Sequence, residues 1–159
     1  MSLVSARDIR LADEAATARL GAAIAGVLRP GEAVCLSGPL GAGKSTLARA
    51  LIRALTAPDE EVPSPTFTLV QFYDGRGLNI AHFDLYRLTS PDEAYEIGLD
   101  EALEDGAALI EWPERLEGAL PADRLDIDLT PESGPDGEAR RARLTPHGSW
   151  TGRGLEFGS

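Results

Sequence analysis

The chain has 159 residues, one cysteine and a formal net charge of −11 at pH 7. This length is enough for one domain whose core needs no disulfide, and Cys35 alone can form neither an intramolecular bridge nor a cysteine-based zinc cluster. No apolar run reaches the ~18 residues of a membrane span, and the first residues lack the apolar core of a signal peptide, so we expect a cytoplasmic protein with no membrane partner. The acidic charge should repel the backbone of RNA or DNA.

The first half of the chain alternates predicted helices and strands. Asp13 is a good N-cap for a helix over residues 13–28. An apolar run predicts a buried parallel strand over 33–37, and leucines at every fourth position predict an amphipathic helix over 46–55. Residues 57–66 are too rich in proline for regular structure, which predicts a long, mobile loop.

The middle of the chain predicts a hairpin, a short helix and a further strand. Strands over 67–73 and 78–83 are separated by a glycine-containing turn, which predicts an antiparallel pair. A Ser-Pro-Asp-Glu capping box begins a short helix over 90–97. Another apolar run predicts a buried strand over 107–110.

The last third predicts a closing hairpin. Alternating apolar and polar residues indicate strands over 125–129 and 139–145, joined by a turn over 133–137. The tail after Trp150 is expected to be frayed. Neither an internal repeat nor a second domain is visible, so residues 1–159 are expected to form one domain.

The segment between the predicted strand at 33–37 and the helix at 46–55 is Gly-Pro-Leu-Gly-Ala-Gly-Lys-Ser, a full G-x-x-x-x-G-K-[ST] phosphate-binding loop. Its glycines can adopt dihedral angles that other residues avoid, so that successive N–H groups turn inward and bind an anion at a helix N-terminus. A glycine-rich turn that binds nothing is the alternative, and the flanking strand and helix argue against it. We therefore predict an α/β fold: a single P-loop NTPase-like domain with a mixed, mainly parallel sheet, flanking helices and antiparallel hairpins. The loop residues expected to bind a nucleotide are Gly38, Leu40, Gly41, Ala42, Gly43, Lys44, Ser45 and Thr46.

Lys44 is the only lysine in the chain, and every other basic side chain except the two histidines is arginine. A compact ammonium can lie between phosphate oxygens, where the planar guanidinium is the wrong shape. We expect Lys44 to hold phosphates, Ser45 to bind Mg²⁺ through its hydroxyl and Thr46 to reach the α-phosphate. The Asn-Lys-x-Asp element that usually selects guanine would need a second lysine, so ATP is the predicted nucleotide.

A Mg²⁺ ion held by Ser45 also needs a carboxylate at the end of a nearby strand. Asp84 and Glu111 each follow a short predicted strand. Because ligands collect at the carboxyl ends of parallel strands, both carboxylates should lie at the edge where the phosphates bind. Asp84 could instead cap a turn, and Glu111 could be a surface acid before a proline-started helix.

Two other groups of polar residues are expected to have structural roles. Neither His82 nor His147 has a cysteine or histidine neighbour at metal-ligand spacing. Arg140, Arg141 and Arg143 form the one basic cluster, which we interpret as the solvated face of a late strand, with a docking site as the alternative.

Four motifs follow one another along the chain. They are the phosphate loop at 38–46, Ser-Pro-Thr-Phe-Thr-Leu-Val at 64–70, His-Phe-Asp-Leu-Tyr-Arg-Leu at 82–88 and Glu-Trp-Pro at 111–113. In these motifs and their order the chain resembles the TsaE family, the ATPases of bacterial tRNA threonylcarbamoyladenosine synthesis. The resemblance covers residues 10–116, and the C-terminal third carries no motif.

The resemblance implies an ATPase that works in a complex with the TsaB and TsaD proteins, where TsaD transfers the threonylcarbamoyl group to adenosine 37 of tRNA. Direct, stable binding of tRNA by this acidic chain is not expected. The implied catalytic residues are Lys44, Thr66, Asp84 and Glu111, and the implied Mg²⁺ ligands are Ser45, Asp84 and Glu111. Asp84 would take the Walker B part, Thr66 would lie in a switch-like loop, and Glu14 and Thr17 match the region near the adenine.

Two other functions fit a phosphate-loop domain of this size. A small-molecule kinase usually needs a lid of clustered arginines, whereas the loops here contain only the scattered Arg76, Arg87 and Arg115. A nucleotide-gated binding module without turnover needs only one metal-positioning acid, so the pair Asp84 and Glu111 favours hydrolysis. A screen for phosphorylated acceptors and a measurement of turnover with and without partners would separate these functions.

Overall fold

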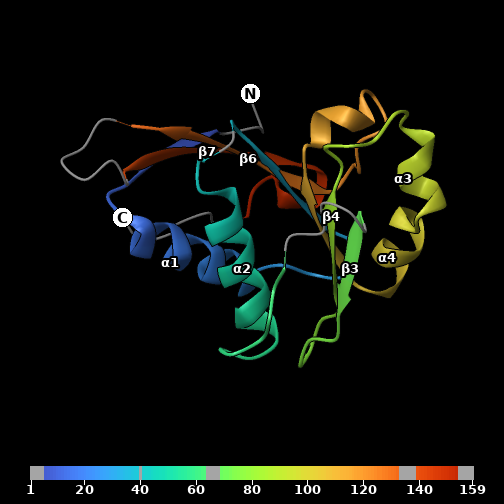
Figure 1. Cartoon of the computed structure of the whole chain (residues 1–159), viewed down its shortest axis with the longest axis horizontal. Coiled ribbons are helices and arrows are strands. Elements are labelled where there is room, and N and C mark those ends of the chain that lie inside the picture. Colours follow the sequence, from blue (N-terminus) through green and yellow to red (C-terminus); the bar gives the residue numbers. More distant parts are fainter. Residues whose placement is uncertain (1–5, 40, 64–68, 133–138, 154–159) are drawn as a thin grey trace.

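The computed structural model describes residues 6–39, 41–63, 69–132 and 139–153, which form a seven-stranded mixed sheet with helices on both faces (Figure 1). The strand order is β1-β7-β6-β2-β5-β4-β3. The strands are β1 (Arg7–Leu11), β2 (Ala33–Ser37), β3 (Val70–Tyr73), β4 (Ile80–Asp84), β5 (Ala107–Glu111), β6 (Arg124–Pro131) and β7 (Arg140–His147). The helices are α1 (Glu14–Ala25), α2 (Lys44–Leu55), α3 (Asp92–Glu96) and α4 (Leu99–Asp105), with 3-10 turns at Pro113–Leu116 and Gly148–Trp150.

The centre of the sheet is parallel. Strands β6, β2, β5 and β4 run in the same direction, while β3, β7 and β1 pair antiparallel with their neighbours. Glu111 is in register with Leu36 on one side and with Asp84 on the other, so the ends of β2, β5 and β4 lie side by side. The predicted α/β, P-loop NTPase-like architecture with antiparallel hairpins is confirmed.

Successive residues of the central strands pack into two separate cores. Val34 and Leu36 of β2 face α1 and α2, whereas Ala33 and Cys35 face α3 and α4. All four side chains are fully buried, which explains why β2 is a continuous apolar run in the sequence. Cys35 is a core residue, and burial raises the pKa of its thiol.

Helix α1 begins as predicted and ends earlier than predicted. The Asp13 side chain caps it by accepting a 2.8 Å hydrogen bond from the N–H of Ala16. The helix ends at Ala25 and not at residue 28: the N–H of Gly26 still donates to the carbonyl of Ala22, but the N–H of Val27 donates to the carbonyl of Ile24, three residues earlier, so the α-helical bonding stops there. Leu28 is buried outside the helix, which is why the apolar pattern did not reveal this end.

The structure contains two elements that the sequence pattern did not predict. Strand β1 buries only Ile9 and Leu11, and it depends on pairing with the distant strand β7. Gly98 has a φ of 104° and turns the chain directly into the additional helix α4. Within the described ranges, no helix is long and apolar enough to cross a membrane.

The expectation of a frayed tail after Trp150 is wrong for its first residues. A side-chain nitrogen of Arg153 lies 2.6 Å from Oε2 of Glu32, and both side chains are buried. This ion pair anchors the chain as far as Arg153, and residues 154–159 lie outside the described part. The predicted hairpin turn at 133–137 and residues 67 and 68 of the strand predicted over 67–73 also lie outside it. Leu69 is described and does not belong to this strand: its φ of 67° is left-handed, and β3 begins at Val70.

Candidate functional site

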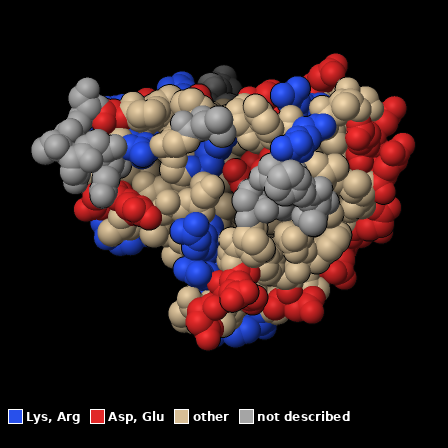
Figure 2. Space-filling view, in the orientation of Figure 1, with Lys and Arg blue, Asp and Glu red and all other residues tan. Residues whose placement is uncertain are grey.

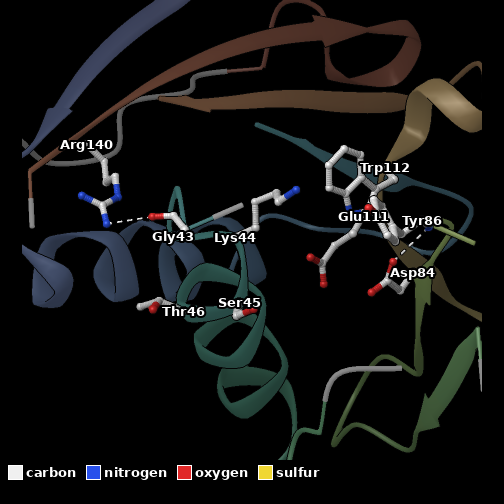
Figure 3. A pocket seen from close by; sticks show the side chains of 10 residues that line it. Gly43, Lys44, Ser45, Thr46, Asp84, Tyr86, Glu111, Trp112 and Arg140 are labelled. Atoms are coloured by element: carbon white, nitrogen blue, oxygen red, sulfur yellow. Dashed lines mark hydrogen bonds between the residues drawn. The ribbon is translucent and has the colours of Figure 1, made fainter. Parts of the chain in front are cut away.

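A cavity of about 430 Å³ lies between the phosphate loop and the ends of β4 and β5 (Figure 3). The residues that line it are Gly41, Gly43, Lys44, Ser45, Thr46, Asp84, Tyr86, Glu111, Trp112 and Arg140. The fold therefore brings the predicted phosphate loop and both predicted carboxylates to one place. Tyr86, Trp112 and Arg140, which were not among the predicted nucleotide or metal ligands, also line the cavity.

The phosphate loop has the backbone conformation that its glycines allow. Gly38, Gly41 and Gly43 have φ angles of 139°, 80° and 98°, which L side chains avoid. At Gly38 there is also no room, since a Cβ would lie 2.3 Å from the carbonyl oxygen of Leu129. Helix α2 begins directly after Gly43, so the N–H groups of its first turn, which have no partner within the helix, border the cavity. Ala42 is fully buried, and the predicted residue Leu40 lies outside the described residues.

Lys44 is held in place by two contacts within the chain. It is 6% exposed, and Nζ donates a 2.7 Å hydrogen bond to the carbonyl oxygen of Gly38. Nζ also lies 3.7 Å from the centre of the Trp112 ring, which is a cation–π contact. Burial lowers the pKa of the ammonium, and the nearby carboxylates, Glu111 first among them, act in the opposite direction. A bound anion would exchange these contacts for its own oxygens.

Asp84 and Glu111 are buried carboxylates, 6% and 5% exposed, in register on neighbouring strands. In Figure 3 their carboxyl groups point into the space that faces Ser45. Asp84 Oδ1 also accepts a 3.1 Å hydrogen bond from the N–H of Tyr86, so it caps the turn after β4 as well. Across the described residues, no three histidine, cysteine or acidic side chains are grouped so as to hold a metal. Two carboxylates and a hydroxyl are hard oxygen donors that fit Mg²⁺ if a ligand supplies the remaining oxygens.

His82 contacts this site although it was expected to be only structural. It is 2% exposed, and its Nε2 lies 2.6 Å from Oε2 of Glu111. The prediction for His82 rested on its distance along the sequence from other possible metal ligands. That distance cannot reveal a contact between residues on neighbouring strands. His147 contacts Asp126 at 2.9 Å and does not line the cavity.

Trp112 and Tyr86 form the aromatic wall of the cavity. Trp112 has left-handed backbone angles, φ 60° and ψ 50°, and its ring centre lies 4.9 Å from that of Tyr86. Both residues belong to motifs that carry the family resemblance, which was the available signal for them.

Arg140 reaches the phosphate loop from the start of β7. Its Nη2 donates a 2.9 Å hydrogen bond to the carbonyl oxygen of Gly41. The prediction of a solvated strand face is therefore wrong for Arg140. It describes Arg141 and Arg143, which are exposed side chains that pair with surface acids. No local pattern in the sequence distinguishes Arg140 from its neighbours.

Glu14 and Thr17 lie beside the phosphate loop, at the start of α1. The Thr46 hydroxyl donates a 3.5 Å hydrogen bond to Glu14 Oε1. Glu14 and Thr17 share a cavity of about 110 Å³ with Gly43, Thr46 and Arg140. This smaller cavity adjoins the main one, because the last three residues line both. The predicted residue Thr66 lies outside the described part of the chain.

The sheet topology and the phosphate loop define a P-loop NTPase-like domain. The chain belongs to the TsaE family, since the family model "Threonylcarbamoyl adenosine biosynthesis protein TsaE" matches residues 11–142. The resemblance seen in the sequence motifs is thereby confirmed.

Individual relatives agree with this assignment. The tRNA threonylcarbamoyladenosine biosynthesis protein TsaE of Rickettsia bellii is 39% identical over 129 residues, which cover 81% of this chain and 89% of that protein. The TsaE protein of Bacillus subtilis is 38% identical over 122 residues, covering 76% and 73% of the two chains. The crystal structure of Bacillus subtilis YdiB superimposes with a TM-score of 0.72 at 28% identity, covering 93% of this chain and 90% of that one.

Proposed function

We propose that this chain is the Mg²⁺-dependent ATPase of tRNA threonylcarbamoyladenosine synthesis and that it hydrolyses ATP in a complex with the TsaB and TsaD proteins. The observation that carries the proposal is one cavity that joins Lys44 and Ser45 with the buried carboxylates Asp84 and Glu111. The family to which the chain belongs supports the biosynthetic context.

The phosphate loop would bind the β- and γ-phosphates of ATP. The N–H groups at the start of α2 would donate to phosphate oxygens, and Lys44 would leave the Gly38 carbonyl to do the same. Glu14, Thr17 and Arg140 are proposed to lie on the adenosine side, because their smaller cavity adjoins the loop.

Ser45, Asp84 and Glu111 are the residues that would hold Mg²⁺. When bound, this ion would neutralise charge that develops on the phosphate oxygens. In hydrolysis, water forms a bond to the γ-phosphorus and gives up a proton to a phosphate oxygen or to solvent. The bond to the β–γ bridging oxygen breaks, and ADP carries away the electron pair. Lys44 would stabilise the negative charge on the departing oxygens.

Hydrolysis is favoured over transfer to a small-molecule acceptor. A kinase encloses the transferred group with several arginines, whereas Arg140 is the only arginine among the described residues that line the cavity. A screen of candidate acceptors for ATP-dependent phosphorylation would test this choice, and water is the expected acceptor.

Protein partners, and not tRNA, are expected to stimulate turnover. Figure 2 shows acidic side chains gathered along the side of the molecule formed by α3 and α4, and the whole chain has a net charge of −11. Such a surface disfavours a phosphate backbone. A partner that covers the cavity would exclude water other than the reacting molecule.

The test compares ATP turnover by the chain alone, with tRNA, and with the TsaB–TsaD pair. Only the pair should raise turnover strongly, and Lys44→Ala should abolish the increase. The increase should also fall in Thr66→Ala, if this residue acts in a switch-like loop. Strong stimulation by tRNA alone would contradict the proposed partner dependence, and the absence of ATP binding under all conditions would contradict the ATPase function.

A further inference from the structure

His82 and Glu111 form a buried contact, and the proposed function assigns no role to His82. Imidazole Nε2 lies 2.6 Å from Glu111 Oε2, and the two side chains are 3% and 7% exposed. His82 precedes Asp84 by two positions on β4, and Asp84 is in register with Glu111. All three side chains therefore lie on one face of the sheet.

The contact constrains Glu111 through one of its two oxygens. A carboxylate oxygen has no hydrogen to donate, so we assign the hydrogen of this 2.6 Å contact to Nε2, which donates to Oε2. No side chain or backbone group in the described ranges donates a hydrogen bond to Oε1. Among the described residues, the carboxyl group is thus held at one oxygen only.

Packing alone does not account for an imidazole at this position. Nδ1 is buried and has no hydrogen-bond partner in the described part of the chain. A buried polar atom without a partner disfavours the folded state, and an apolar side chain of similar volume would avoid this cost. The bond to Glu111 is the described contact that uses the polarity of the ring.

We infer that His82 is a positioning residue that orients the Glu111 carboxylate for the metal of the bound nucleotide, an inference that rests on the proposed function. By fixing Oε2, the imidazole limits rotation of the carboxyl group and leaves Oε1 for the metal. Groups that hydrogen-bond a metal ligand from behind typically change metal affinity or activity by about 10–100-fold when they are removed.

Mn²⁺ is the probe, because its binding to the ATP complex can be followed by electron paramagnetic resonance without turnover. His82→Leu removes the hydrogen-bond donor and fills the same space with an apolar side chain of similar size. His82→Gln restores an amide N–H at a similar reach. His147→Leu is the matched control, since His147 also contacts a carboxylate, Asp126 at 2.9 Å, but away from the cavity.

His82→Leu should weaken Mn²⁺ binding by roughly 10–100-fold while ATP affinity in EDTA stays within about twofold. His82→Gln should recover most of the lost Mn²⁺ affinity, and His147→Leu should match the parent chain. In the Glu111→Gln background, His82→Leu should cause no further loss, because the carboxylate that it positions is gone. Parent-like Mn²⁺ binding in His82→Leu, or equal additional losses in both backgrounds, would overturn the inference.

If His82→Leu fails to fold, the inference can still be tested by measuring the tautomer of His82 in the unsubstituted chain. With ¹⁵N-labelled histidine, His82 should show a protected Nε2–H proton and the corresponding tautomer, and His147→Asn assigns the two rings. The opposite tautomer would overturn the inference. A parent chain that binds no Mn²⁺–ATP would contradict the proposed function, whereas normal binding that is insensitive to His82 would contradict the positioning role alone.

Discussion

Lys44→Arg tests whether the shape of this cation matters as well as its charge. Nζ lies between the carbonyl oxygen of Gly38, at 2.7 Å, and the ring centre of Trp112, at 3.7 Å. A single ammonium fits this space. The guanidinium spreads its charge over a wider plane and could not enter without displacing the ring or the loop carbonyl.

The expected loss follows from the bonds that the ammonium would make. A hydrogen bond to a charged group contributes about 1.5–3 kcal/mol, and about 1.4 kcal/mol corresponds to a tenfold change in an equilibrium constant. Loss of one lysine–phosphate bond should therefore weaken ATP binding by roughly 10–100-fold. Lys44→Ala, which also removes the charge, should weaken it further.

Calorimetric titration of ATP with Mg²⁺ would measure the affinity of Lys44→Arg, Lys44→Ala and the parent chain. Arg49→Lys is the matched control, because it makes the reverse exchange on the same helix at a residue that does not line the cavity. Thermal unfolding would show that each variant is folded. If Lys44→Arg matched the parent in both binding and turnover, the argument from shape would be refuted.

Glu111→Gln should reduce ATP hydrolysis at least ~10-fold while changing ATP affinity little, because the amide keeps the shape of the ligand but loses its charge; equal losses in kinetics and calorimetry would contradict this. Burial alone would raise the pKa of Glu32, but hydrogen bonds, that of Arg153 first, outweigh burial and lower it. The pair therefore stabilises the fold above the pKa of an unfolded glutamate, about 4.3, and this contribution is lost as the pH falls through the lowered pKa of the folded state. Urea unfolding of Arg153→Met should show a loss of about 3 kcal/mol at pH 7 that shrinks in acid, and a loss independent of pH would speak against the ion pair. Gly38→Ala should destabilise by about 3 kcal/mol or more, since its Cβ would meet a backbone carbonyl at 2.3 Å. Gly41→Ala, with a φ of 80° and no atom of the described residues within 4 Å of a Cβ, should cost about 1–2 kcal/mol. The reverse order of the two losses in thermal unfolding would exclude this explanation.

Features of the site that depend on a few neighbouring residues were predictable. The glycines of the phosphate loop, the cap at Asp13 and the buried strand β2 each follow from residue types within one or two turns of chain. The positions of Asp84 and Glu111 at the carboxyl ends of β4 and β5 were also predictable from the sequence, because apolar runs mark buried strands and parallel strands end at one edge of the sheet. Whether these residues bind Mg²⁺ and ATP stays a prediction.

Strand pairing and side-chain contacts across the sheet were decided only by the tertiary structure. His82 meets Glu111 because β4 and β5 are neighbours, and Arg140 reaches Gly41 because β7 pairs antiparallel with β6 and begins beside the loop. Strand β1 has too few apolar residues to be recognised without its partner β7. Periodicity and capping report interactions over a few residues, whereas these contacts join residues whose separation along the chain carries no information until the order and register of the strands are known.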